Sequence, residues 1–249
     1  MGPGLFNRLR AAGLVWASLA TLAALAVLLS LGTWQMNRKA WKEALIAEIA
    51  SRTAQQPVDI GNHIFEGAAD YTRVRLQGRF LHAHERYLFA DGREGSGFHV
   101  LTPLEIAAGR VVWVNRGYIP ARLKEPATRP GGQLEGAAGI VGLVRLPGGR
   151  NSFTPDNDIT KNVWFWRDLK ALDASIAAAK VQAAPVMVDA EAEPANSGGW
   201  PMGGTTIVTL SNRHLEYALT WYGLAATLIG VYLAFAWGRL RRPVTGLKE

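Results

Sequence analysis

The 249-residue chain contains no cysteine, only five histidines and only four methionines. The lack of cysteine excludes a disulfide framework, a zinc–thiolate site and a cysteine nucleophile. The four methionines are too scattered to predict a copper relay: Met1, Met36, Met187 and Met202. Motifs of serine hydrolases, zinc proteases, P-loop proteins and dinucleotide-binding proteins are also missing. The sequence therefore does not predict an enzyme.

Charged side chains are absent from two long stretches, Ala11–Gln35 and Ala218–Gly238. As a helix, each stretch is long enough to cross a hydrocarbon core of about 30 Å. The first is too long for the apolar core of a signal peptide, which is about 7–15 residues. We therefore expect two transmembrane helices, at residues 11–35 and 213–238.

The basic residues indicate how these helices are oriented. Net charge is +7, and much of the surplus lies in the two ends of the chain. Four basic residues follow the second span, whereas Arg213 alone comes just before it: Arg239, Arg241, Arg242 and Lys248. The positive-inside rule then predicts cytoplasmic tails at residues 1–10 and 239–249, and an extracytoplasmic domain at residues 36–212. The positive charge is better explained by membrane orientation than by nucleic-acid binding.

Alternating apolar and polar residues predict a β-rich domain between the spans. In residues 71–80, apolar side chains alternate with Arg73, Arg75 and Arg79, which predicts a strand with one basic face. The first helix is expected to continue to about Arg52 as a stalk. Further strands are predicted at 86–89, 97–104, 110–118, 137–145, 185–188 and 205–210, with one helix at 168–180 and a flexible insertion at 121–135. The expected fold class is an α+β membrane protein in which two transmembrane helices flank a mostly antiparallel β domain.

Three histidines of this domain are weak candidates for a site. His82 and His84 would lie on the same side of a strand, a spacing that can bind a metal. No third ligand is suitably spaced, however, and a solvated loop is the simpler interpretation. His99 lies within an apolar strand, which is typical of a hydrogen-bonded core histidine.

The start of the second span has a more informative pattern. Helical spacing places His214, Tyr217, Ala218, Trp221 and Ala225 on one face. A flat apolar ligand could lie on this face with one axial nitrogen donor. The alternative is an interfacial histidine beside ordinary aromatic residues of the membrane boundary. Because the first span contains no histidine, a group held by two histidines of this chain is not expected.

Six motifs carry a resemblance to a known family: Leu31–Gln35, Trp41–Lys42, Val74–Phe80, Gly97–Leu104, Val114–Pro120 and Asn212–Ala225. In this order, from about residue 31 to 236, the chain resembles the surfeit-locus family of cytochrome c oxidase assembly factors. The last motif is the most specific. Arg213 and Glu216 within it depart from the family pattern, in which uncharged polar residues are expected.

The resemblance implies a non-enzymatic factor that binds haem a transiently and helps to insert it into the catalytic subunit of the oxidase. It implies His214 as ligand of the haem iron, with Tyr217 and Trp221 packing the macrocycle. The implied partners are oxidase subunit one, haem a synthase and the lipid bilayer, with no nucleic acid. The short stretch before the first span is expected of a bacterial inner-membrane protein whose main domain is periplasmic.

The sequence is also compatible with two other functions. A scaffold could hold oxidase subunit one during assembly without touching haem. A membrane-anchored sensor is the third possibility, but the short tails offer no cytoplasmic output domain.

Overall fold

The computed structural model describes residues 10, 13–59, 69–92, 94–206 and 211–241. The chain forms two compact units. One combines the two ends of the chain, residues 1–47 and 209–249, and the other consists of residues 48–208.

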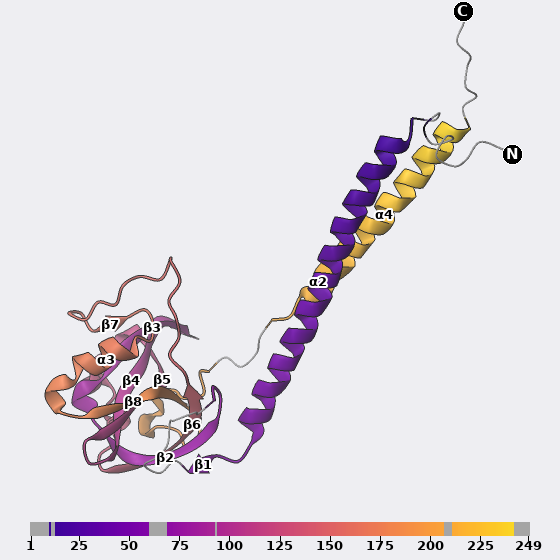
Figure 1. Cartoon of the computed structure of the whole chain (residues 1–249). Coiled ribbons are helices and arrows are strands. Elements are labelled where there is room, and N and C mark those ends of the chain that lie inside the picture. Colours follow the sequence, from indigo (N-terminus) through magenta and orange to yellow (C-terminus); the bar gives the residue numbers. More distant parts are fainter. Residues whose placement is uncertain (1–9, 11–12, 60–68, 93, 207–210, 242–249) are drawn as a thin grey trace, which may run out of the picture. The chain divides into compact units, whose positions relative to one another are not determined.

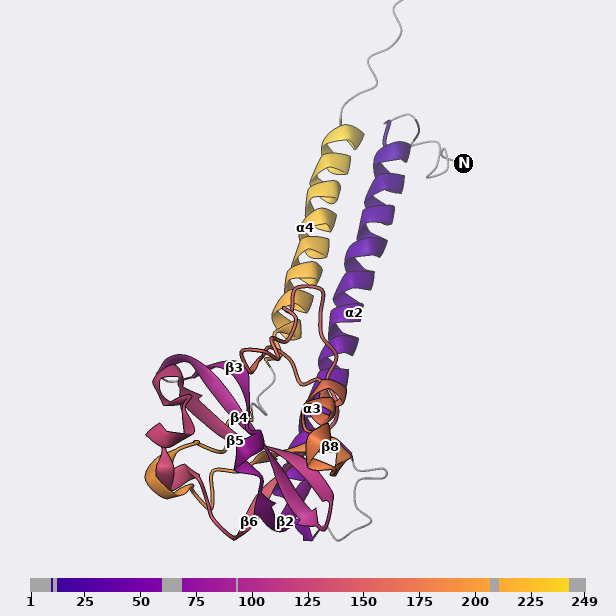
Figure 2. The same cartoon turned by 90° about the vertical axis from the view of Figure 1, so that its left-hand side faces the viewer.

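The first unit is a pair of long helices that run side by side in both views, α2 (Val15–Ala54) and α4 (His214–Leu240) (Figures 1 and 2). Both are long and apolar enough to cross a membrane, and only 6% and 11% of their most apolar stretches are buried within the protein. Such exposure is unlike that of a core helix in a soluble protein, and it fits a two-pass membrane protein. The predicted helices are confirmed, including the continuation of the first beyond residue 50.

The second unit is built on a sheet of eight strands. Their bounds are β1 (Val58–Asp59), β2 (Arg73–Phe80), β3 (Arg86–Gly92), β4 (Gly95–Ala107), β5 (Arg110–Pro120), β6 (Ala137–Arg145), β7 (Val163–Trp164) and β8 (Gln182–Ala190). Their order is β1-β2-β6-β8-β5-β4-β3-β7, and β2 also pairs with β4. That extra pairing closes β2, β6, β8, β5 and β4 into a barrel (Figure 1).

Most strand pairs are antiparallel, as the sequence predicts, although three pairs run parallel: β1 with β2, β3 with β7, and β5 with β8. The barrel interior is filled by the alternate side chains of these strands. On β2, Val74, Leu76 and Phe80 point into this core and are almost fully buried. A short helix, α3 (Leu169–Ser175), packs Leu172 against Trp113 and Trp164 in a second cluster.

The outer face of β2 carries the three predicted arginines, but its positive charge is compensated. Each arginine pairs with an acidic residue, and the pairs are Arg73 with Glu191 at 2.7 Å, Arg75 with Asp59 at 3.6 Å, and Arg79 with Glu105 at 3.0 Å. This face is therefore a set of ion pairs and not an open basic surface.

Several local predictions were wrong. Residues 121–135, expected to be flexible, form three short 3-10 turns, η2 (Ala121–Leu123), η3 (Pro126–Thr128) and η4 (Pro130–Gly132). The segment is ordered because Arg129 is buried and donates to the Glu85 carboxylate.

Two further expectations concern the ends of the domain. The strand predicted at 185–188 is longer, since β8 covers nine residues and lies inside the sheet between β6 and β5. The strand predicted at 205–210 falls largely outside the described residues, and Thr205 and Thr206 are not in a strand.

Candidate functional site

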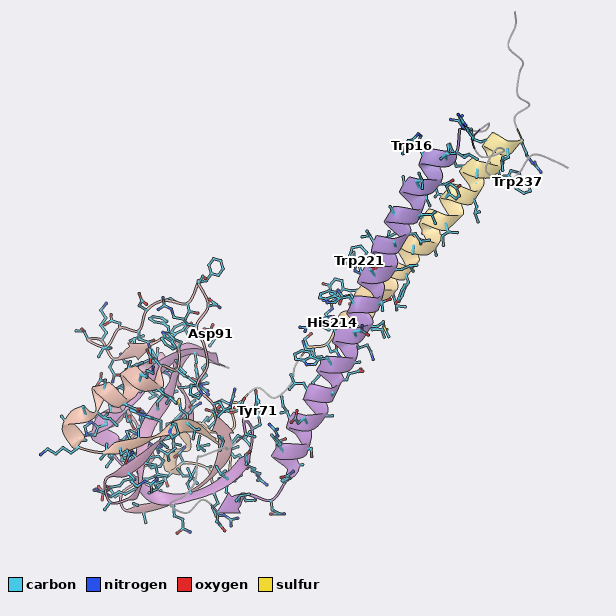
Figure 3. All side chains as sticks on the ribbon, viewed as in Figure 1. Trp16, Tyr71, Asp91, His214, Trp221 and Trp237 are labelled. Carbon is cyan, nitrogen blue, oxygen red and sulfur yellow. The ribbon has the colours of Figure 1, made fainter. Side chains whose placement is uncertain are left out.

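His214 is the first residue of α4, and its half-buried side chain contacts α2. Its Nδ1 atom lies 2.7 Å from the amide oxygen Oε1 of Gln35. Gln35 is only 9% exposed, although it lies at the end of the long apolar run. Figure 3 labels His214 at the start of α4, beside α2. The helix pair therefore holds this imidazole by one of its two nitrogens.

Small residues allow the two helices to approach at this point. Ala218 and Ala225 of α4 are buried, and so is Gly32 of α2. A Cβ on residue 32 would lie 2.6 Å from Cε1 of Tyr222. The Tyr222 hydroxyl also lies 3.3 Å from the Thr33 hydroxyl. The close contact one turn before Gln35 keeps the Gln35 amide within reach of His214.

The two aromatic residues predicted for the site differ in exposure. Trp221 is half-buried and lies on the same face of α4 as His214, about two turns further along the helix. Tyr217 is 54% exposed. In the part of the chain that is described, no ring contact joins either side chain to His214. Both rings lie within two turns of the imidazole and have surface that a flat apolar ligand could cover.

The polar surroundings of His214 are simple. Arg213 and Glu216 pair with each other at 2.7 Å. The amide oxygen of Asn212 is buried and has no hydrogen-bond partner among the described residues. On α2, the Arg38 guanidinium lies over the exposed Trp41 ring, 4.5 Å from its centroid.

The other histidines do not form a comparable site. His82 lies in a 3-10 turn, η1 (His82–His84), and its ring contacts Glu85 and the Leu134 carbonyl. His99 is half-buried beside Asn115; burial, followed by the charge of Arg167, lowers its pKa. Across the described residues, no three His, Cys, Asp or Glu side chains are placed to hold a metal ion. His63 lies outside the described residues.

Sequence reasoning missed a buried polar cluster in the β domain. The Glu85 carboxylate is 2% exposed and accepts hydrogen bonds from Arg116 and Arg129, each 1% exposed. Burial alone would raise the pKa of Glu85, but hydrogen bonds from His82 and Arg129 lower it to about 2. Arg116 also donates to the Gly132 carbonyl and to Asn196. The cluster joins segments far apart in sequence, which indicates a structural role.

Two features of His214 bear on haem binding, namely its second ring nitrogen and the apolar residues around it. Haem iron in a single-histidine site takes one imidazole nitrogen, and the macrocycle needs an apolar, aromatic environment. Nε2 of His214 makes no hydrogen bond to any described residue, so one nitrogen is available. Trp221 lies about two helical turns from His214, and α4 is apolar beyond it. The site therefore combines one nitrogen donor with apolar surface.

These features define a class of protein, a β-barrel domain between two membrane-capable helices with a histidine held at their contact. Within this class, the SURF1 family model matches residues 22–226, a range that contains Gln35, His214, Tyr217 and Trp221. The chain belongs to the SURF1 family.

Curated relatives agree with this assignment. The chain is 39% identical over 214 residues to human surfeit locus protein 1, covering 79% of this chain and 69% of the human protein. It is 36% identical over 238 residues to a SURF1-like protein of Monosiga brevicollis, covering 90% and 88% of the two chains. A SURF1-like protein of Drosophila melanogaster is 35% identical over 228 residues, covering 84% and 72%. Membership of this family supports a role in cytochrome c oxidase assembly.

Proposed function

We propose that the chain is a non-enzymatic assembly factor that binds haem a through His214 and helps to insert it into the catalytic subunit of cytochrome c oxidase. One observation carries the proposal: His214 lies at the contact of two membrane-capable helices with Nδ1 engaged by Gln35 and Nε2 without a described partner. A histidine in this arrangement can offer one nitrogen to an apolar ligand at the boundary of the bilayer.

The residues around His214 would act together in holding haem. Nε2 of His214 would be the single protein ligand to the iron, and Trp221 and Tyr217 would pack against the macrocycle. When bound, haem a supplies an iron that accepts a nitrogen donor. A single histidine holds haem less tightly than two, which suits a carrier that must release it. Haem is apolar, so a site at the helix pair would keep it out of water.

Transfer also requires a partner and a location. We propose that the β domain docks on oxidase subunit one and that haem a synthase is the source of the cofactor. We propose a bacterial inner membrane as the location. A periplasmic β domain is supported by the basic residues that gather after the second helix. The proposed order is binding at the membrane, docking through the β domain and release to the oxidase.

A scaffold that holds subunit one without binding haem is the second candidate. It is favoured by a pocket of 950 Å³ in the β domain, lined partly by Tyr118, Trp200 and Met202. Pockets of this size that are mostly apolar are typical binding sites. A segment of a partner protein could occupy it. In this account, His214 would have no part in assembly.

The experiment that separates the two accounts measures haem a per oxidase in a bacterial host that lacks its own SURF1-family gene. Wild-type protein should restore the haem a content of purified oxidase, whereas His214→Ala should leave it low. Leu215→Ala is the matched control, since Leu215 is the next residue and is 44% exposed. Full restoration by His214→Ala, at equal protein level, would reject haem delivery through His214 and support the scaffold.

A further inference from the structure

The hydrogen bond between His214 and Gln35 determines which nitrogen of the imidazole carries the proton. An amide oxygen accepts hydrogen bonds and cannot donate them. Oε1 of Gln35 faces Nδ1 of His214 at 2.7 Å, and this geometry favours Nδ1–H as the donor. A neutral imidazole has one N–H, so Nε2 then carries the lone pair. That lone pair is what a metal ligand requires.

We propose that Gln35 is a positioning residue that holds His214 in the Nδ1–H tautomer and so presents Nε2 to haem iron. The inference rests on the proposed haem-binding function and adds to it a residue on the opposite helix. Metal-binding histidines commonly donate their second N–H to an oxygen acceptor, which fixes the orientation and protonation of the ring. Here the acceptor is a buried glutamine of α2.

Because Gln35 is buried, its amide has few possible hydrogen-bond partners other than His214. The side chain is 9% exposed, and the contact of Gly32 with Tyr222 lies less than one helical turn away. A buried amide costs free energy unless it is hydrogen-bonded, so Gln35 has a strong preference for a partner on α4. The imidazole of His214 is that partner. The bond therefore stabilises the helix pair and the tautomer at the same time.

The chemistry of the acceptor also suits a carrier. A carboxylate behind a ligating histidine would make the ring a stronger donor to the metal. The neutral amide of Gln35 polarises His214 less than a carboxylate would, so the bond from the imidazole to iron is weaker. Since the two residues belong to different helices, separating α2 from α4 would also break the bond and free the ring to rotate.

The tautomer can be measured directly, without haem, on the full-length protein. Histidine labelled with ¹⁵N in micelles at about pH 8, where an ordinary imidazole is neutral, reports which nitrogen is protonated. His214→Ala identifies the signal. We expect Nδ1–H with unprotonated Nε2 in the wild type, and a mixture of tautomers in Gln35→Leu. Protonated Nε2 in the wild type would overturn the proposal, because Gln35 would then donate through its NH₂ group.

Haem affinity and reduction potential give the second readout. Loss of an outer partner of a ligating histidine typically weakens metal binding by about 10–100-fold, and we expect this for Gln35→Leu. Gln35→Glu should restore binding and lower the reduction potential of the bound haem, because a carboxylate makes the ring more basic. Thr33→Val is the matched control, since it removes the neighbouring interhelical bond to Tyr222 without touching His214.

These outcomes separate the inference from the function on which it rests. If wild-type protein binds no haem, the proposed function fails, while the tautomer measurement still reports on Gln35. If wild-type protein binds haem through His214, and Gln35→Leu binds it with equal affinity and potential, the positioning role of Gln35 is rejected and the proposed function stands.

Discussion

Gly32 of α2 lies so close to Tyr222 of α4 that a Cβ at residue 32 would be 2.6 Å from the tyrosine ring. The contact neighbours the bond between Gln35 and His214, so the spacing of the helices and the position of the histidine are linked. Substitution of this glycine is therefore expected to affect both stability and haem binding.

We expect Gly32→Val to destabilise the helix pair by about 1–3 kcal/mol, the usual cost of overpacking a close contact. The same change should weaken haem binding, because it moves Gln35 away from His214. Thermal unfolding in micelles and a haem titration measure the two effects. Gly230→Val is the matched control, as a Cβ there would have nothing within 4 Å. Equal behaviour of the two variants would mean that the close contact has no effect on the site.

The buried cluster of the β domain gives a prediction about stability alone. Glu85→Gln leaves the buried guanidinium groups of Arg116 and Arg129 without a carboxylate. Breaking a buried ion pair in this way typically costs about 3–5 kcal/mol. Thermal unfolding followed by circular dichroism should show a large decrease in midpoint. Glu94→Gln, which removes an exposed pair with Arg122, should change it little.

Acid should destabilise the protein through the same carboxylate. The pKa of Glu85 is lowered from 4.5 to about 2 in the folded state. The unfolded chain therefore binds a proton more readily, and the stabilising contribution of Glu85 is complete above about pH 4.5. It is lost as the pH falls towards about 2. Unfolding midpoints measured across this window should fall steeply for wild type and less steeply for Glu85→Gln; parallel curves would show that Glu85 is not responsible.

The proposed orientation can be tested because the chain has no cysteine of its own. Phe153 is 94% exposed in the β domain, so Phe153→Cys should react with a membrane-impermeant maleimide added to spheroplasts. Leu240→Cys, at the end of α4, should react only after the membrane is permeabilised. The reverse pattern would place the β domain in the cytoplasm and contradict the assignment from basic residues.

The sequence predicted those parts of the fold that depend on local periodicity. Charge-free runs marked both long helices, and alternation on β2 separated buried Val74 and Leu76 from the outward arginines. Features that depend on distant pairing were not visible in this way. The closure of the barrel through β2 and β4 joins Phe80 to Leu104, and no local pattern specifies such a register.

Only part of the candidate site was predicted, because the contact between its two helices also depends on distant pairing. His214 was a candidate because it is the one histidine beside a span, but Gln35 was taken as the end of the apolar run. A signal for it existed: Leu28, Gly32 and Gln35 are spaced as one face of a helix, and a polar residue on such a face suggests a partner on the other helix. Which residue of α4 would meet Gln35 depends on how far the two helices slide past each other, and neither stretch alone determines this. Residues 121–135 were wrongly expected to be flexible for a similar reason. The segment is ordered by the contact of Arg129 with Glu85, which is 44 residues away and not visible in any local pattern.

The most direct measurement is the optical spectrum of the full-length protein purified in detergent from cells that also synthesise haem a. Wild-type protein should show Soret and α bands of bound haem a, and His214→Ala should lose or shift them. His84→Ala is the control, since it removes a histidine of the β domain and should leave the spectrum unchanged. A folded wild-type protein without these bands, or a His214→Ala variant with the wild-type spectrum, would contradict haem binding through His214.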